Sequence, residues 1–116
     1  MKTVLNCNEA CNRASVEYIP EQGVEHDATN QILVVEVVRE TEIKVYVDGI
    51  YKVTLGSYNY KQPLSIVDVH SQIMIDGGVG LMFSVVVTND QHTFDITYKV
   101  AHNELSVFHN GVRFDI

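Results

Sequence analysis

Two-residue turns between alternating runs constrain the fold of this chain more than any other feature. Asp48-Gly49 separates EIKVYV from IYKVTL, and Asn110-Gly111 separates ELSVFH from VRFDI. Both central positions of such a turn need φ > 0, which Asp-Gly and Asn-Gly tolerate, so each dipeptide predicts a β-hairpin. Similar β-branched and aromatic runs with period two continue through most of the chain from residue 31 onward.

The expected elements are short and regularly spaced. We expect strands at 31–39, 42–47, 50–55, 64–75, 79–88, 93–100, 104–109 and 112–116, with a further strand at 16–19. Turns are expected at 76–78, 89–90 and 101–103, loops at 21–30 and 56–63, and one turn of helix at 8–14. About nine strands and almost no helix predict a single all-β domain over residues 1–116, an antiparallel β-sandwich of jelly-roll type.

The hairpins also predict which side chains face the core. In the last hairpin, His109, Val107 and Leu105 are expected opposite Val112, Phe114 and Ile116, all on the inner face. In the first hairpin, Ile43, Val45, Val47 and Ile50 are expected inside, with Tyr46 and Tyr51 outside. The outer tyrosines form a cross-strand pair, which could bind a ligand or could only stabilise the ribbon.

The two hairpins belong to an internal repeat with a constant offset of 62 residues. EIKVYVDGI at 42–50 aligns with ELSVFHNGV at 104–112, and the alternation upstream of each also matches. The repeat indicates either a sandwich with a pseudo-twofold axis or the convergence expected of any meander with tight turns.

Composition limits the class of partner. The chain has 116 residues, 46% of them hydrophobic, and a formal charge of -7, which excludes non-specific binding to nucleic acid phosphates. It has no apolar run long enough for a membrane helix and no signal peptide core. We therefore expect a cytoplasmic protein, or one exported without a visible signal. Cys7 and Cys11 are too few for a zinc site and are expected as reduced thiols.

No constellation of catalytic residues is apparent. The chain lacks Gly-x-Ser-x-Gly, His-Glu-x-x-His and a phosphate-binding glycine loop, so we expect neither an enzyme nor a cofactor. His102 and His109 could approach each other in the final hairpin, with His70 as a third ligand. The alternative is that these histidines are ordinary surface or turn residues, and we expect no metal site.

Residues 31–81 resemble part of a galectin carbohydrate-recognition domain. The family carries Phe-x-Val-x-Val-Asn-Gly followed by Pro-Leu-Ser-x-Val-Asp, and this chain has IKVYVDG at 43–49 and PLSIVD at 63–68. The family's His-x-Asn-x-Arg strand is partly matched by HNGVR at 109–113, where His and Arg keep their spacing and the Asn is shifted by one position. The resemblance implies a galectin-like sandwich and a sugar site at His109, Asn110 and Arg113. A circularly permuted order would bring Asn8, Arg13 and Glu17 beside them.

The sequence therefore predicts a non-catalytic recognition module. In the lectin-like version, the polar residues above bind sugar hydroxyls, and Tyr46 and Tyr51 contact a sugar ring, because the chain has no Trp. The alternative is an acidic protein-binding module or inhibitor that docks a basic partner through exposed strands and aromatics. The partner is thus a carbohydrate or a protein, and pairing of strand edges could give a homodimer.

Overall fold

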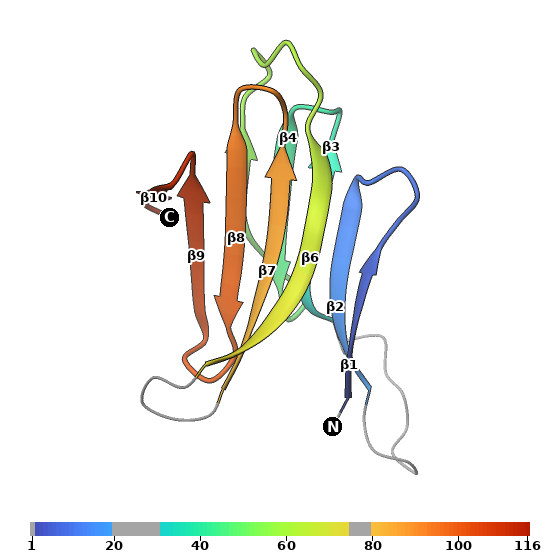
Figure 1. Ribbon diagram of the computed structural model, residues 1–116, viewed down its shortest axis with the longest axis vertical. Helices are drawn as coiled ribbons and strands as arrows, with labels where there is room; N and C mark the ends of the chain where they lie inside the picture. Colours follow the sequence, from blue (N-terminus) through green and yellow to red (C-terminus); the bar gives the residue numbers. More distant parts are fainter. Residues whose placement is uncertain (1, 20–30, 75–79) are drawn as a thin grey trace.

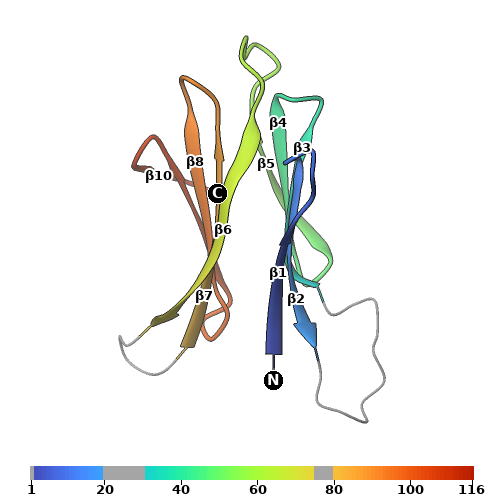
Figure 2. The ribbon, with the colours of Figure 1, turned by 45° about the vertical axis from the view of Figure 1, so that its right-hand side comes forward.

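The computed structural model describes residues 2–19, 31–74 and 80–116, and these residues form two five-stranded antiparallel sheets without any helix. The first sheet consists of β1 (Lys2–Cys7), β2 (Arg13–Ile19), β3 (Gln31–Val38), β4 (Glu42–Val47) and β5 (Ile50–Gly56). The second consists of β6 (Ser65–Met74), β7 (Gly80–Thr88), β8 (Thr93–Lys99), β9 (Glu104–His109) and β10 (Val112–Phe114). The sheets pack face to face (Figures 1 and 2). The predicted all-β antiparallel sandwich is confirmed.

The strand connections are those of two consecutive meanders. Every strand pairs with the next one in sequence except at β5 and β6, where the chain passes from the first sheet to the second. A jelly roll is instead built from Greek keys, in which a long connection returns the chain to a strand that is not its neighbour in sequence. The described strands therefore do not have the expected jelly-roll connections, because tight turns place successive strands side by side.

Both predicted hairpins form, with the expected pairs next to each turn. The first register shifts at a bulge between Val45 and Tyr46, and the expected pair of Leu105 with Ile116 is wrong, because β10 ends at Phe114. Asp48 and Gly49 have φ of 52° and 78°, and Asn110 and Gly111 have φ of 51° and 83°, as two-residue hairpin turns require. The repeat is structural: β3–β4–β5 and β8–β9–β10 are the last three strands of the two sheets and lie 62 residues apart.

The N-terminal region differs from the prediction. Lys2–Cys7 forms β1, which was not expected, and β2 begins at Arg13 rather than at Val16. The expected helical turn is wrong, because the Asn8 Oδ1 accepts hydrogen bonds from the backbone N–H groups of Asn12 and Arg13, both at 3.0 Å. Such a side chain stabilises a turn in place of a helix. The loop expected at 21–30 and the turn expected at 76–78 lie outside the described residues. The strands on either side of that turn, β6 and β7, are described.

One hydrophobic core lies between the sheets. Its fully buried side chains come from both sheets and are Phe83, Phe94, Leu33, Ile43, Ile96, Val16, Val35, Val45, Val47, Val85, Val87 and Val107. The nearly continuous apolar run of β3 is covered on both faces, since Val34 points outward beside Tyr46 in the register and is still only 4% exposed. The prediction for Ile50 is wrong: its pairing with Val47 turns it inward, but it is 61% exposed.

Candidate functional site

The segment from His109 to Arg113, which carries the galectin-like spacing, does not converge on one ligand. His109 pairs with Val112, and Phe108 pairs with Arg113, so the side chains of His109 and Arg113 lie on opposite faces of the sheet. The Asn110 Oδ1 accepts a hydrogen bond from the Thr93 backbone N–H at 2.8 Å. The turn inside the motif reverses the chain, and this reversal separates its His from its Arg.

The other half of the predicted sugar site lies on different strands. Asn8 caps the turn between β1 and β2, and Arg13 and Glu17 belong to β2. Strands β1 and β10 are the first strand of one sheet and the last strand of the other, and they lie on opposite sides of the molecule (Figure 1). The structure therefore does not bring Asn8, Arg13 and Glu17 beside His109, Asn110 and Arg113.

The predicted aromatic pair on the outer face of the first sheet is confirmed. Tyr46 pairs with Tyr51 across β4 and β5, with ring centroids 6.0 Å apart and planes inclined by 68°. Tyr51 is 53% exposed, and its hydroxyl lies 2.7 Å from the Thr54 Oγ1. One ring face of this pair is therefore open to a ligand, with a fixed hydroxyl beside it.

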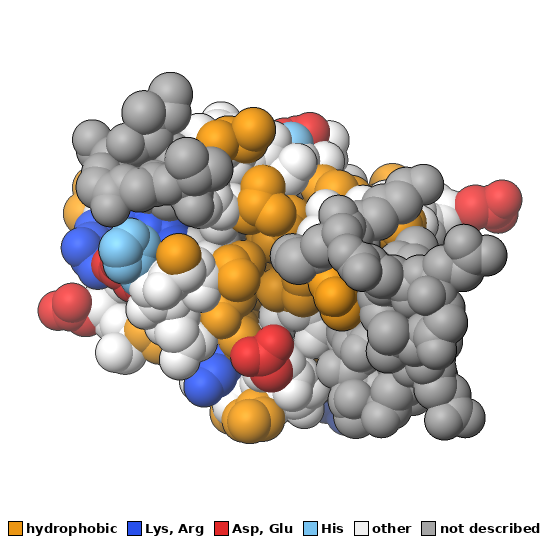
Figure 3. Space-filling model, turned by 90° about the horizontal axis from the view of Figure 1, so that it is seen from below, with side chains coloured by type: hydrophobic (Ala, Val, Ile, Leu, Met, Phe, Trp, Pro, Cys, Tyr) orange, Lys and Arg blue, Asp and Glu red, His pale blue; other side chains and the backbone are white. Residues whose placement is uncertain are grey.

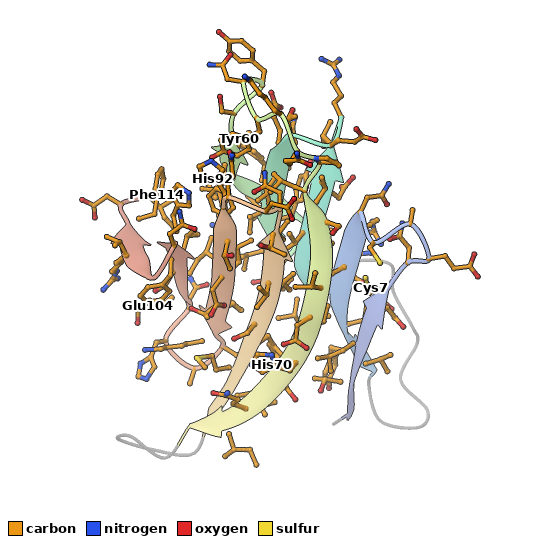
Figure 4. All side chains as sticks on the ribbon, turned by 45° about the horizontal axis from the view of Figure 1, so that its top comes forward. Cys7, Tyr60, His70, His92, Glu104 and Phe114 are labelled. Carbon is orange, nitrogen blue, oxygen red and sulfur yellow. The ribbon has the colours of Figure 1, made fainter. Side chains whose placement is uncertain are left out.

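Four stacked rings close the end of the sandwich at which β9 ends. Tyr60 stacks on His92 at 4.1 Å, His92 on His109 at 5.1 Å, and His109 on Phe94 at 4.5 Å between centroids. Figure 4 shows Tyr60 and His92 together at this end. The His92 Nδ1 and the His109 Nε2 are 2.8 Å apart, so one nitrogen donates a hydrogen bond to the other. Burial, and then the neighbouring His92, lower the pKa of His109, which favours the neutral form that this bond requires.

The three-histidine grouping considered from sequence is not formed. His109 contacts His92 rather than His102, which lies in the turn before β9, at the other end of that strand. His70 lies on β6, and its Nδ1 is 2.5 Å from the Asp68 Oδ2. Residues 2–19, 31–74 and 80–116 contain no cluster of three or more His, Cys, Asp or Glu side chains that could hold a metal ion.

A row of mixed polarity crosses the outer face of the second sheet. From β6 to β10, the paired residues are Asp68, Val86, Asp95, Phe108 and Arg113. The Asp95 Oδ1 is covered, and it has no hydrogen-bond partner among the described residues. Burial raises the pKa of Asp95, while His70 lowers it and Asp68 raises it. This carboxyl group is therefore held in a setting that disfavours its charge.

The next row on the same face consists of short hydroxyl side chains. Ser84, Thr97 and Ser106 pair across β7, β8 and β9 and are at most 8% exposed. The Thr97 hydroxyl donates a hydrogen bond to the Ser106 carbonyl oxygen at 3.4 Å. The groups open to a partner on this face are therefore the flanking charges, such as Arg113 with its Nη2 3.5 Å from the Glu104 Oε1.

Exposed apolar side chains lie along the side of the sandwich formed by β5 and β10. Ile50 and Val112 are at opposite ends of it, because the segment after β5 carries Tyr60 onto His92 and His109, beside Val112. We call Ile50, Val112, Phe114 and Ile116 the apolar margin; their exposed fractions are 61%, 71%, 42% and 57%. The pairings of Ile50, Val112 and Phe114 with Val47, His109 and Val107 turn these three toward the inside of the sandwich. A cavity of about 180 Å³ adjoins the margin and is lined by Val47, Lys52, Tyr98, Asn103, Leu105 and Ile116.

The margin was not predicted as a site. Period-two alternation assigned Val112, Phe114 and Ile116 to the core, and the alternation correctly predicts the face on which Val112 and Phe114 lie. It carries no signal for whether another sheet covers that face. Hydrophobic side chains also gather between the sheets at the end of the sandwich seen in Figure 3, and Phe114 lies at the β10 side in Figure 4.

Comparison with protein-family models, with curated proteins and with solved structures found no match for this chain. The described residues also include no helix with the length and apolar character needed to cross a membrane. The residues and their geometry therefore carry the functional argument.

Proposed function

We propose that this protein is a non-catalytic recognition module that binds a partner protein at the apolar margin. The observation that supports the proposal is that Val112, Phe114 and Ile50 face inward in the register but remain 42–71% exposed. Exposed apolar side chains along one side of a domain often mark an interaction surface.

The margin favours an extended apolar segment of the partner. Strand β10 ends its sheet and pairs only with β9 among the described strands, so a partner segment could lie along its free edge while its side chains contact the margin. The strand is only three residues long, which limits backbone pairing and leaves side-chain burial as the larger contribution. The net charge of -7 favours a partner with basic residues flanking the apolar segment.

The expected contribution of each side chain is modest. Full burial of a Val, Ile or Phe side chain is worth about 1.5–3 kcal/mol. Each margin residue has roughly half of its surface left to bury, so each should contribute about 1 kcal/mol, which corresponds to roughly a fivefold change in Kd.

A selection from a library of displayed linear peptides tests this proposal. We expect the protein to enrich peptides with an apolar centre and basic flanks, and Phe114→Asp to weaken their binding by roughly fivefold or more. Tyr58→Asp is the matched control, because Tyr58 is 82% exposed and lies in the connection between β5 and β6, outside the margin. Failure to enrich any peptide, or equal binding by Phe114→Asp and the wild type, would count against the proposal.

Carbohydrate binding is the second candidate function, and the Tyr46–Tyr51 pair favours it. The pair offers an exposed ring beside the Tyr51 hydroxyl and Thr54, a combination of stacking surface and hydrogen-bonding groups that suits a sugar. A glycan array with Tyr51→Ala as the control variant tests this function. Binding to no glycan, or binding that persists in Tyr51→Ala, would remove it.

A further inference from the structure

The two cysteines lie together at a cavity on the side of the molecule opposite to the apolar margin. Cys7 is the last residue of β1, and Cys11 lies in the turn between β1 and β2. Both line a cavity of about 320 Å³ between β1 and β6, with Leu5, Asn6, Ile66, Val67, Asp68 and Val69. Both are free thiols; Cys7 is exposed and Cys11 is half-buried. Figure 4 shows Cys7 at this hairpin, away from Phe114.

The backbone holds Cys11 in a fixed position against β6. Its φ of 55° lies in the left-handed region, and its N–H donates to the Asn8 carbonyl oxygen at 3.0 Å. Its own carbonyl oxygen accepts a hydrogen bond from the Ile66 N–H at 2.8 Å, which links the two sheets. The turn is further fixed by the Asn8 side chain. The Cys11 Sγ lies 3.8 Å from the Glu9 carbonyl oxygen, and the thiol lines the same cavity as the Cys7 thiol.

We propose that Cys7 and Cys11 form a reactive dithiol that closes to an intramolecular disulfide by exchange with a small disulfide of the glutathione type. The exposed Cys7 thiolate attacks one sulfur of the small disulfide, whose S–S bond breaks and releases one thiolate. The Cys11 thiolate then attacks the Cys7 sulfur and displaces the second small thiolate. Both cysteines are oxidised by one electron each, the small disulfide is reduced to two thiols, and the two cysteine protons go to these products.

The second step is favoured because it occurs within one molecule. Cys11 is four residues from Cys7 and lines the same cavity, so its effective concentration exceeds that of a dissolved thiol. Burial, and then the nearby Cys11, raise the pKa of Cys7. The thiolate that starts the exchange is therefore scarce at neutral pH, and the reaction should become faster as the pH rises toward the alkaline range.

Incubation of the purified protein with oxidised glutathione, followed by intact-mass measurement and thiol titration, tests this proposal. The wild type should go from two reactive thiols to none, lose the mass of two hydrogen atoms and retain no glutathione. The matched variants Cys7→Ser and Cys11→Ser should each retain one bound glutathione, because neither has a second thiol to displace it. Dithiothreitol should restore both thiols in the wild type.

The proposal would be overturned if the wild type retained bound glutathione instead of losing the mass of two hydrogen atoms. It would also be overturned if oxidation produced only disulfide-linked dimers. Both outcomes are visible in the mass of the wild type alone, so the test does not depend on the folding of the variants. Because the apolar margin is not involved, the result is independent of the peptide-binding experiment.

Discussion

Replacement of Gly56 by alanine should destabilise the fold far more than replacement of either hairpin glycine. Gly56 ends β5 with φ of 86°, and a Cβ atom there would overlap the Thr41 carbonyl oxygen. That oxygen also accepts a hydrogen bond from the Ser57 N–H at 3.2 Å. Gly49 and Gly111 have similar φ values, 78° and 83°, but an added Cβ would have no atom within 4 Å. They are therefore matched controls for the cost of the backbone conformation alone.

The magnitudes follow from these contacts. A left-handed conformation costs a non-glycine residue about 1–2 kcal/mol, and reduced entropy of the unfolded chain offsets about 0.4–1 kcal/mol of that cost. Gly49→Ala and Gly111→Ala should thus each lower the free energy of unfolding by about 1 kcal/mol. In Gly56→Ala the Thr41 carbonyl must also move and lose its partner, which costs a further ~1–3 kcal/mol. A total of about 2–4 kcal/mol is a large part of the ~5–15 kcal/mol typical of a domain.

Equilibrium unfolding in urea measures this difference. With an m-value of about 2 kcal/mol per molar urea, the midpoint should fall by about 1–2 M for Gly56→Ala and by about 0.5 M for each control. Equal shifts in all three variants would refute the close approach of Thr41 to Gly56. The comparison matters for the site, because Ser57 begins the segment that carries Tyr60 onto His92.

Three further substitutions test the titrating and stacked side chains. The pKa of His109 is lowered in the fold, so the unfolded chain binds the proton more readily, and the free energy of unfolding should be full above pH ~6.5 and fall below it. His109→Phe should therefore flatten the pH dependence of the urea midpoint between pH 5 and 8. An unchanged pH dependence would contradict this. The pKa of Asp95 is raised, so its charge costs stability as pH rises past the unfolded value near ~3.9. Asp95→Asn should then raise the free energy of unfolding by about 1 kcal/mol at pH 7, which is the lower end of the cost of an unpaired buried acceptor. It should raise it little at pH 3. Equal gains at the two pH values in thermal unfolding would contradict this. Tyr60→Ala should lower the free energy of unfolding by about 1 kcal/mol because the stack on His92 is lost. The control Tyr58→Ala, at an 82% exposed position, should change it by less than ~0.5 kcal/mol. Equal effects of the two substitutions would argue against the stack.

Local turn chemistry explains why much of the fold was predictable. Asp48-Gly49 and Asn110-Gly111 fix both the turn and the register of their hairpins, so the facing of Tyr46, Tyr51 and Val107 follows from sequence neighbours alone. Strand β1 was missed because its pairing depends on the Asn8 turn and on packing against β6, neither of which period-two alternation reports.

The candidate sites were less predictable because they depend on contacts distant in sequence. The spacing of His109 and Arg113 suggests one face of a single strand, but the chain reverses between them, so they separate. His92 meets His109 only because the turn after β7 and the end of β9 lie at the same end of the sheet. The thiol pair was visible as a spacing of four residues, but the cavity beside it requires β6, which begins more than fifty residues later.

The internal repeat accounts for the apolar margin. Ile50 and Val112 occupy equivalent positions at the offset of 62, each opening the last strand of its sheet. Both are turned inward by their hairpins, and both are exposed, at 61% and 71%. In each copy the hairpin turn sets the direction of the side chain, but the facing sheet does not cover this position, whereas it does cover Leu55 on the same strand as Ile50. The same architecture that specifies the core thus leaves apolar side chains uncovered where each meander ends, which is where we place the partner.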